Sequence, residues 1–458
     1  MAGEAKTPVT KGWLYHPSYP DHWKRRPLYS LARWINGLAF RDIQFSPSGM
    51  PVIKIAEIKG GISGQTKFTQ QTFDEPVRVR PGDLLFSWSG QPETSIDVFW
   101  WRGPEGWLNQ HVFRVTPADG IDPTFFYYLL RYLKPNFIGI ARNKQTTGLG
   151  HVTKRDLESM EAAYPPRQEQ RAIARILGTL DDKIELLRKQ NATLEAMARA
   201  LFKDWFVDFG PVRAKMEGRD PYLPRAVWDL FPDRLVESEI GEIPEGWEVT
   251  KLGEMINTVK GTSYRSDELA ESDTALITLK SFARGGGYRV DGLKSFSGAY
   301  KPTQVVVPGE VVIACTDVTQ AAEVIGRPAV ARATNEYRTL VASLDTLIAR
   351  PREPEMTRSF LYFLAGTEEF IAHTYAHTTG TTVLHLSKDA VPSFRFACPP
   401  PKLVKLFDSL ASSVLHRLQA IQQESDVLAT LRDTLLPKLI SGELRVPEAM
   451  RQTAEAMA

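Results

Sequence analysis

Residues 173–205 read IARILGTLDDKIELLRKQNATLEAMARALFKDW, and their apolar positions return in alternating steps of four and three. A period of 3.5 residues keeps one stripe of a helix facing a partner helix over many turns, as in a coiled coil. At a rise of 1.5 Å per residue, such a helix spans roughly 50 Å. The stripe consists of Ile173, Leu177, Leu180, Ile184, Leu187, Asn191, Leu194, Ala198, Leu201 and Trp205. This stretch therefore predicts a long helix that pairs with another long helix.

A second stripe with the same steps lies in the last part of the chain. It consists of Leu403, Phe407, Leu410, Val414, Arg417, Ile421, Glu424, Leu428, Leu431 and Leu435. A single helix of this kind could equally lie on its own domain, but a matched pair favours an antiparallel coiled coil. In that arrangement Asn191 lies near Arg417, and a polar contact there would fix the register of the two helices.

Other motifs also occur twice, in the same order. Val79–Leu85 returns as Val306–Val312, an offset of 308 − 81 = 227 between the prolines. Thr146-Thr147-Gly148 returns as Thr378-Thr379-Gly380, and Pro165-Pro166 as Pro399-Pro400, the last at an offset of 399 − 165 = 234. Ordered matches with a slowly growing offset indicate a tandem duplication with small insertions.

Each half of the chain follows one plan. Residues 20–120 and 245–350 are apolar, glycine-rich and typical of short strands joined by turns. A short aromatic helix, the Thr-Thr-Gly loop, a Pro-Pro pair that starts a helix and the long helix follow. The predicted fold class is therefore α+β, with two tandem α/β domains separated by two long helices that form an antiparallel coiled coil, in a pseudo-twofold duplication.

Composition places few limits on function. Hydrophobic residues make up 43% and charged residues 24% of 458 residues, which is usual for a folded protein. The net charge of +2 neither requires nor excludes nucleic acid, because binding needs a basic patch rather than a basic total. The start of the chain lacks the apolar core of a signal peptide, and Cys315 and Cys398 have no metal-like spacing. We expect a soluble, cytoplasmic protein.

Several stretches resemble the conserved regions of type I restriction-modification specificity subunits. They are Tyr164–Gln170, Leu180–Ile184, Phe202–Phe209, Ile240–Trp247 and Leu435–Leu444. Their order, together with the duplication, makes the resemblance specific over nearly the whole chain. One departure is that Pro399-Pro400-Pro401-Lys402-Leu403 lacks the Gln-Glu-Gln that follows Pro165-Pro166-Arg167. We expect this loss to weaken a contact with a partner subunit without affecting the fold.

The resemblance implies a non-catalytic recognition subunit of a multisubunit methyltransferase and endonuclease, which reads a two-part DNA target. The implied organisation is 1–164 target-recognition domain 1, 165–209 central conserved long helix, 210–242 linker, 243–398 target-recognition domain 2, 399–444 C-terminal conserved long helix, and 445–458 tail. The implied partners are double-stranded DNA, modification subunits with adenine-N6 methyltransferase activity, and translocating nuclease subunits. S-adenosylmethionine, and ATP with Mg, would serve those partners, and no cofactor is expected in this chain.

Candidate DNA contacts lie where the duplicated loops are polar. Base edges are read by hydrogen-bond donors and acceptors, whereas basic groups on phosphates set the register. The first-half candidates are Lys59, Lys67, Ser87, Trp88, Arg142, Lys144, Gln145, Thr146, Thr147 and His151. The second-half candidates are Lys280, Arg284, Thr316, Asp317, Tyr375, His377, Thr378, Thr379 and His385. The same loops could instead only turn the chain and cap the next helix through Thr153 or Ser387, and Trp88 could belong to the core.

Three other interpretations stay open. Asp21, Glu57 and Lys59 could form a metal-dependent nuclease site, although the second half lacks matching residues. His373 and His377, at i and i+4, could share a metal. The chain could also be a coiled-coil adaptor that binds only proteins. No Gly-Lys-Ser/Thr phosphate loop and no methyltransferase Asn/Asp-Pro-Pro-aromatic loop occur in the sequence.

Overall fold

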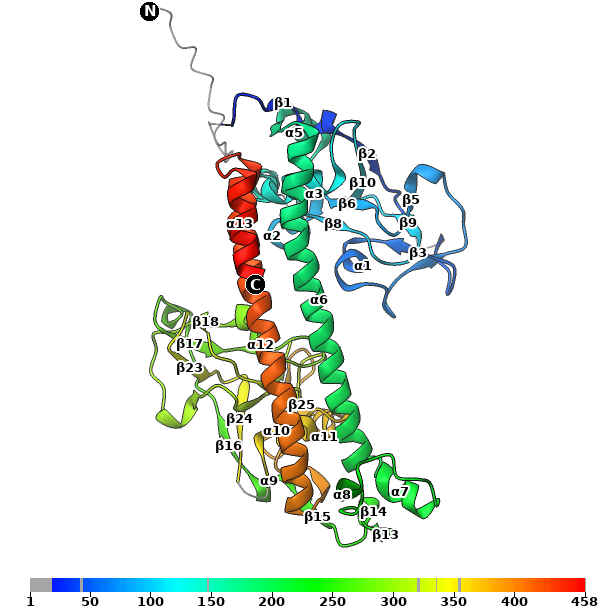
Figure 1. Ribbon diagram of the computed structural model, residues 1–458, viewed down its shortest axis with the longest axis vertical. Coiled ribbons are helices and arrows are strands. Elements are labelled where there is room, and N and C mark those ends of the chain that lie inside the picture. Colours follow the sequence, from blue (N-terminus) through cyan, green and yellow to red (C-terminus); the bar gives the residue numbers. More distant parts are fainter. Residues whose placement is uncertain are drawn as a thin grey trace, which may run out of the picture. The chain divides into compact units, whose positions relative to one another are not determined.

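The computed structural model describes residues 19–41, 44–145, 148–318, 322–334, 336–352 and 356–457. The chain forms two compact units: unit 1 comprises Met1–Leu187 with Glu424–Ala458, and unit 2 comprises Arg188–Gln423. Two helices of 40 residues, α6 (Arg167–Phe206) and α12 (Pro401–Ile440), each contribute to both units (Figure 1). Each helix begins directly after or within its Pro-Pro run, where a missing N–H is tolerated.

Two four-stranded sheets build the first half of the chain, in unit 1. The antiparallel sheet has the order β2 (Ala32–Asn36), β10 (Val112–Pro117), β6 (Leu84–Ser87) and β8 (Asp97–Trp100). The mixed sheet has the order β4 (Phe68–Thr69), β3 (Met50–Ile53), β9 (Gly106–Leu108) and β5 (Arg78–Val79), with β3 and β9 parallel. β1 (Lys24–Pro27) pairs with β12 (Glu161–Tyr164), which leads into α6. Buried Ile53, Leu85 and Trp107 belong to one core between these strands.

The second half repeats this topology strand for strand, in unit 2. Its antiparallel sheet has the order β16 (Ile256–Lys260), β24 (Thr346–Pro351), β20 (Val311–Ala314) and β22 (Pro328–Val330). Its mixed sheet has the order β18 (Lys294–Ser295), β17 (Thr274–Ile277), β23 (Thr339–Ala342) and β19 (Val305–Val306), with β17 and β23 parallel. β15 (Glu248–Lys251) pairs with β27 (Arg395–Cys398), which leads into α12. The duplication in the sequence is therefore a duplication of the fold.

Short helices follow the sheets in both halves. α3 (Pro123–Tyr132) and α4 (Lys134–Asn143) correspond to α10 (Arg358–Ala365) and α11 (Glu368–Ala376). The Asp122 carboxylate caps α3 by accepting from the N–H groups of Thr124 and Phe125, and the Thr357 hydroxyl caps α10 by accepting from the N–H of Phe360. Their aromatic side chains are buried against the antiparallel sheet of the same unit.

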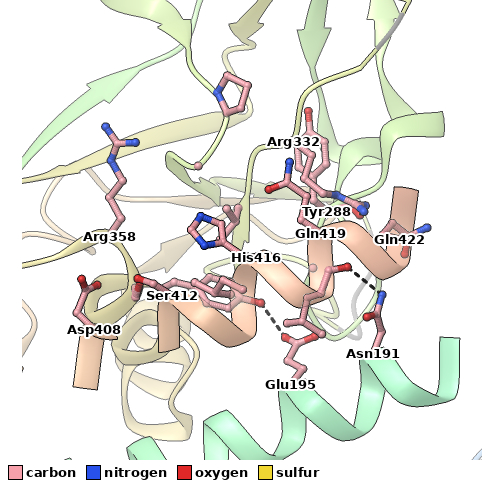
Figure 2. Close-up of a pocket in the computed structure, with 18 of the residues that line it drawn as sticks. Asn191, Glu195, Tyr288, Arg332, Arg358, Asp408, Ser412, His416, Gln419 and Gln422 are labelled. Atoms are coloured by element: carbon pink, nitrogen blue, oxygen red, sulfur yellow. Dashed lines mark hydrogen bonds between the residues drawn. The ribbon is translucent and has the colours of Figure 1, made fainter. Parts of the chain in front are cut away.

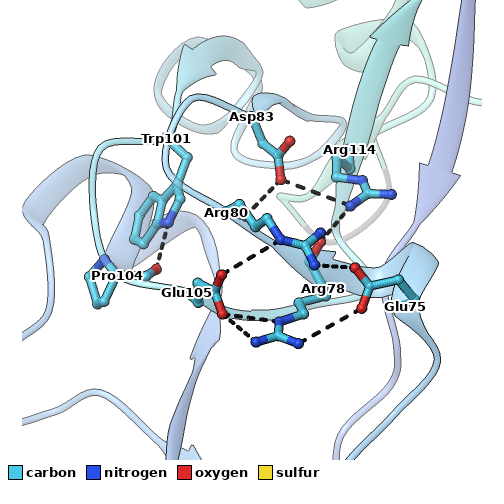
Figure 3. Close-up of polar contacts among 8 residues, drawn as sticks. All are labelled: Glu75, Arg78, Arg80, Asp83, Trp101, Pro104, Glu105 and Arg114. Atoms are coloured by element: carbon cyan, nitrogen blue, oxygen red, sulfur yellow. Dashed lines mark hydrogen bonds and ion pairs between the residues drawn. The ribbon is translucent and has the colours of Figure 1, made fainter.

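The duplicated Pro-Gly-acid motif is a turn held by its own carboxylate. Gly82 and Gly309 have φ of 91° and 89°, a conformation that favours glycine. Asp83 Oδ2 accepts from the Arg80 N–H at 2.7 Å and lies 3.9 Å from Arg114 Nη1 (Figure 3). Glu310 repeats both contacts, with the Val307 N–H at 2.9 Å and Arg350 Nε at 2.6 Å. This motif is therefore structural in both halves.

The long helices pair within each unit. In unit 1, Arg432 Nη1 of α12 donates to Asp181 Oδ1 of α6 at 2.6 Å, and Lys183 Nζ lies 3.0 Å from Glu424 Oε1. In unit 2, Phe407 packs its ring against Phe202 at a centroid distance of 5.2 Å. Later residues of α6 thus contact earlier residues of α12, so the two helices run antiparallel. The predicted α+β fold class is confirmed.

The stripe on α12 differs in phase from the predicted one. Leu410 keeps 45% of its side-chain surface exposed and Arg417 is exposed, whereas Ala411 and Ser425 are 2% exposed. The residues facing inward follow the positions 407, 411, 414, 418, 421, 425 and 428, which is again an alternation of four and three. Small side chains at 411 and 425 allow close packing, so the positions of Leu410, Arg417 and Glu424 in the predicted stripe are wrong by one residue.

The predicted α6 stripe and the remaining α12 positions face inward. The buried side chains are Ile173, Leu177, Leu180, Ile184, Leu187, Ala198, Trp205, Leu403, Phe407, Ile421, Leu428 and Leu435, and the half-buried ones are Asn191, Leu194, Leu201, Val414 and Leu431. No hydrogen bond joins Asn191 to the Arg417 side chain among the described residues. Its Nδ2 donates instead to the backbone carbonyl of Leu418 at 3.3 Å (Figure 2).

The segments that follow the two long helices also form helices and strands. α7 (Gly210–Met216), α8 (Arg225–Trp228) and the hairpin of β13 (Leu235–Ser238) and β14 (Gly241–Pro244) follow α6 in unit 2. α13 (Val446–Met457) follows α12 in unit 1. Within the described ranges, no helix is both long enough and apolar enough to span a membrane.

Candidate nucleic-acid interface

Two candidate loops of the first half meet in a small ribbon. β7 (Ser89–Gly90) pairs antiparallel with β11 (Gly150–His151), so that His151 lies opposite Ser89. The N–H of Val152 donates to the carbonyl of Trp88 at 2.8 Å. Gly150 is required here because a Cβ would lie 2.3 Å from the carbonyl oxygen of Ala141. The fold thus brings Ser89 and His151 together, although they lie 151 − 89 = 62 residues apart in the chain.

The second half builds the same ribbon. β21 (Thr316–Asp317) pairs with β26 (Leu384–Leu386), which also pairs with β25 (Thr378–Thr379). Thr316 and Thr379 both lie opposite His385, and Thr316 Oγ1 is 3.3 Å from His385 Nδ1. The ribbon therefore occupies the same place in the duplicated fold as β7 and β11.

Three first-half candidates have partners within the protein. Lys144 Nζ lies 2.6 Å from both carboxylate oxygens of Asp156, whose side chain also accepts from Thr153. Burial alone would raise the pKa of Asp156, but the hydrogen bonds from Lys144 and Thr153 lower it overall. Arg142 pairs with Glu93, and Gln145 Nε2 donates to the Gly148 carbonyl at 2.7 Å. Thr146 and Thr147 lie outside the described residues.

The remaining first-half candidates of the ribbon differ in exposure. Trp88 is half-buried, donates from Nε1 to Asn36 Oδ1 at 3.0 Å and lies 5.8 Å from the Phe113 ring. Ser87 is fully buried, and its hydroxyl has no hydrogen-bond partner among the described residues. His151 is half-buried. Trp88 and His151 line the ribbon, whereas Ser87 lies beneath it.

The second-half candidates divide in the same way. Asp317 is 2% exposed, and its Oδ2 accepts from the backbone N–H groups of Val324 and Ile325. Thr316 is also buried. Tyr375, Thr379 and His385 are exposed, while Thr378 and His377 are half-buried. The exposed side of this ribbon therefore consists mostly of hydroxyl and imidazole groups.

The basic candidates lie on loops of the mixed sheets. Lys59 in α1 (Ile55–Gly60), Lys67 and Lys280 are exposed. Burial of its stem lowers the pKa of Lys59, and Lys67 Nζ lies 6.0 Å from the centre of the Phe45 ring. Arg284 pairs with Glu323 at 3.2 Å. These side chains offer positive charge without base-reading geometry.

The nuclease and metal interpretations gain no support from the geometry. Glu57 is buried and accepts from the Lys54 N–H at 3.1 Å, which makes it a cap of α1. His373 Nε2 lies 3.1 Å from Ser393 Oγ, and His377 Nδ1 lies 2.8 Å from the His373 carbonyl oxygen. Burial and the nearby His377 lower the pKa of His373. Across the described part of the chain, no three His, Cys, Asp or Glu side chains are grouped to hold a metal ion.

The Gln-Glu-Gln run has a structural role that the sequence did not reveal. Gln170 is 1% exposed, accepts from the Asp122 N–H at 2.8 Å and donates to the Pro165 carbonyl at 2.8 Å. Its counterpart in the second half, Val404, is 1% exposed and apolar. The departure at Pro399–Leu403 therefore replaces a buried polar contact with apolar packing.

Unit 2 also contains a cavity of 730 Å³, lined by both polar and apolar side chains, that sequence reasoning missed (Figure 2). Its wall includes Asn191, Glu195, Tyr288, Arg332, Arg358 and His416. These residues come from α6, α12 and three separate segments of the second half, so no local motif could indicate it. Glu195 Oε1 accepts from the Tyr362 hydroxyl at 2.7 Å at the cavity wall.

The chain thus holds two copies of one α/β domain, each with a small ribbon that carries polar side chains. Residues 20–196 match the family described as type I restriction modification DNA specificity domain. The chain is 26% identical to the type I restriction enzyme MjaIX specificity subunit of Methanocaldococcus jannaschii, over 91% of this chain and 98% of that protein. It is 23% identical to the HindI specificity subunit of Haemophilus influenzae, over 80% and 87%.

A solved structure of similar extent is the type I restriction-modification system S subunit from M. genitalium, at 17% identity and a TM-score of 0.48, covering 94% of this chain and 99% of that one. Residues 20–196 thus match the type I restriction modification DNA specificity domain, and the chain is similar to type I restriction enzyme specificity subunits along most of its length.

Proposed function

We propose that this subunit reads a bipartite DNA target, with one recognition domain for each half. Residues 1–164 form target-recognition domain 1, and residues 243–398 form target-recognition domain 2. The long helices in 165–209 and 399–444 set the spacing between the half-sites and dock the modification subunits. The observation that carries this proposal is the polar ribbon, which the fold builds twice at equivalent places from unlike residues.

The two ribbons differ where discrimination between bases requires it. The segment before Thr-Thr-Gly offers Gln145 in the first half and Tyr375 and His377 in the second. Amide, phenol and imidazole groups present different donor and acceptor patterns to base edges. The exposed lysines 59, 67 and 280 are suited to phosphate contacts, which fix register without reading sequence. Ser87 and Asp317 support the ribbons from below.

The chemistry of the complete enzyme belongs to its partners in this proposal. Modification subunits with S-adenosylmethionine would methylate adenine in each half-site, and restriction subunits with ATP and Mg would translocate and cut DNA. The specificity subunit would contribute the choice of site. Its own residues hold the domains in place and present the ribbons.

Mapping of adenine methylation in the host, before and after deletion of this chain, tests the proposal. We expect one split motif to lose its methylation completely, because the modification subunits would no longer find their target. An unchanged pattern in a host whose partner genes are active would overturn the proposal.

A salt series with the assembled methyltransferase separates DNA reading from the adaptor alternative. Phosphate contacts release counterions, so affinity falls as salt rises. We expect Lys67→Ala and Lys280→Ala each to lower the slope of log affinity against log salt by about one, uniformly across DNA sequences. DNA retention that does not depend on this chain would support an adaptor instead.

A further inference from the structure

We propose that each recognition domain is locked to α6 by a clamp of a buried tyrosine, a half-buried carboxylate and an arginine, and that these clamps fix the spacing of the two half-sites. Clamp 1 consists of Tyr128, Asp181 and Arg432, and clamp 2 of Tyr362, Glu195 and Arg199. The residues are positioning residues, since they hold the domains and do not contact DNA. This inference rests on the proposed function and names the contacts that would hold each domain at a fixed position on α6.

Clamp 1 joins three elements of unit 1. Tyr128, on α3 of the first domain, is 2% exposed and donates from its hydroxyl to Asp181 Oδ2 of α6 at 2.7 Å. Arg432 of α12 donates to the other carboxylate oxygen, Oδ1, at 2.6 Å. Arg131 of α3 lies 3.8 Å from Asp181 Oδ2. One carboxylate therefore ties the domain to both long helices.

Clamp 2 performs the same task in unit 2. Tyr362, on α10 of the second domain, is 4% exposed and donates to Glu195 Oε1 of α6 at 2.7 Å (Figure 2). Arg199 Nη2 donates to the same oxygen at 2.7 Å and to the Tyr362 hydroxyl at 3.1 Å. Arg199 Nη1 also reaches the Gly366 carbonyl at the end of α10, at 3.4 Å.

The two clamps share their tyrosine but not their carboxylate. Tyr128 and Tyr362 are separated by 362 − 128 = 234, the offset of the Pro-Pro pairs, so they are equivalent in the duplication. At the same offset, the position equivalent to Asp181 on the second helix is 181 + 234 = 415, which is Leu415, and that equivalent to Glu195 is 195 + 234 = 429, which is Ala429. In each half, the equivalent tyrosine thus donates to a carboxylate at a different position of α6. This indicates that the hydrogen bond between the domain and α6 is important, rather than the position of the carboxylate.

Burial makes these contacts directional. Burial raises the pKa of Tyr128 and of Tyr362 well above the ordinary value, so both hydroxyls stay protonated and donate to the carboxylates. A hydrogen bond to a charged acceptor is among the stronger ones in proteins, and it has a narrow range of angles. A domain held in this way has little freedom to rotate about α6. Because successive base pairs lie 3.4 Å apart, even a small rotation would move a ribbon by the width of one base pair.

The test uses the complete methyltransferase, assembled with wild-type subunit or with Tyr128→Phe, Tyr362→Phe or Asp181→Asn. The substrates are duplexes that carry both mapped half-sites at the natural separation, or one base pair closer or further apart. We expect the preference for the natural separation to fall about tenfold in each variant, because one charge-assisted hydrogen bond is lost. The half-site sequences should stay the same. Asp181→Glu, which keeps the carboxylate, should restore part of the preference.

Tyr222→Phe is the matched control. Tyr222 also donates to a carboxylate of α6, Asp204 Oδ2 at 2.8 Å, but it follows the long helix and belongs to neither recognition domain. We expect this variant to keep the wild-type preference for the natural spacing, even if its melting temperature falls. The clamp proposal is overturned if Tyr128→Phe and Tyr362→Phe assemble, methylate and keep the wild-type preference, or if Tyr222→Phe relaxes it equally.

The outcomes also distinguish the clamps from the function on which they rest. If one variant does not assemble, the variant of the other clamp decides the question alone, because the clamps lie in different units. If the wild-type enzyme methylates no split target at all, the proposed function fails. A wild-type enzyme with strict spacing and equally strict clamp variants refutes the clamps only.

Discussion

Asn191 is the polar residue that interrupts the apolar stripe of α6. Its Nδ2 is satisfied by the Leu418 carbonyl, but its Oδ1 is buried with no hydrogen-bond partner among the described residues. An unsatisfied buried acceptor costs free energy that an apolar side chain of similar size does not. We expect Asn191→Leu to raise the free energy of unfolding by about 1 kcal/mol, measured by urea denaturation. A lower urea midpoint would show that Oδ1 is satisfied in solution.

His373 makes the stability of unit 2 depend on pH. Burial and the neighbouring His377 lower its pKa in the folded protein, so the unfolded chain binds a proton more readily than the folded one. Stability from the neutral imidazole is therefore fully present above pH 6.5, the ordinary histidine value, and is lost as the pH falls below it. We expect thermal melts between pH 7.5 and 5.5 to show this loss, and His373→Gln to reduce it.

His416 provides the control for that pH series. It is exposed on α12 and forms no ion pair with the described residues. We expect His416→Gln to keep the wild-type pH dependence. Equal slopes for His373→Gln and wild type would contradict the assignment to His373.

The sequence predicted residue types better than residue roles. Lys144 and Arg142 were candidates for DNA contact because they are basic and lie in a repeated loop, but each pairs with a carboxylate of another segment. Asp156 is in helix α5 (Lys154–Ser159) and Glu93 is in helix α2 (Pro92–Ser95), so neither partner follows from local pattern. Tertiary partners of this kind decide whether a basic group is available.

At the scale of elements, the pairing of α6 and α12 in unit 2 centres on Phe407. Its buried ring lies 5.2, 5.4 and 5.5 Å from the rings of Phe202, Phe206 and Phe363. We expect Phe407→Ala to destabilise the protein by about 3–5 kcal/mol, since the neighbours cannot fill the cavity left behind. Urea denaturation followed by helix circular dichroism measures this change.

Leu410→Ala is the matched control on the same helix. Leu410 is three residues away but largely exposed, so we expect its truncation to change stability by no more than about 0.5 kcal/mol. A large loss at Leu410 would restore the stripe that the sequence predicted and contradict the observed phase.

The existence of both long helices could be predicted from the sequence. Which residues of α12 face α6 could be predicted only in part. Period and proline placement fix where such helices begin, because those signals are local. On α12, however, apolar residues occupy two adjacent phases, and Leu410 is more apolar than Ala411. Ala411 faces the partner helix instead of Leu410 because its smaller side chain lets the two helices approach closely. Which of the two residues fits best depends on the surface of the partner helix, which the α12 sequence does not contain.

At the scale of the whole molecule, the duplication gives the chain two α/β domains that we expect to be exchangeable one at a time. Each domain has its own sheets and its own polar ribbon, built within one unit. We expect replacement of residues 20–155 with the matching domain of a related subunit to change one half-site and leave the other unchanged. Methylation mapping in a host with the chimaeric subunit measures both half-sites at once. A change in both would contradict the model of two independent readers.

The repeated motifs predict the duplicated architecture from the sequence alone, whereas the clamps and the cavity can be seen only in the three-dimensional structure. The order of strands in the second half follows that of the first. The repeated motifs in the sequence were therefore enough to predict two similar domains. Tyr128 and Asp181 are 53 residues apart, and Tyr362 and Glu195 are 167 apart. Contacts at such separations leave no periodic signal in one sequence.

Unit 1 is completed by the two outer segments of the chain, and unit 2 by the segment between them. On a ribosome, therefore, unit 2 has all its residues before unit 1 receives Glu424–Ala458. Until that moment the apolar stripe of α6 from Ile173 to Leu187 lacks its natural cover and is a ready target for chaperones or proteases. A prematurely terminated chain would carry that exposed stripe permanently.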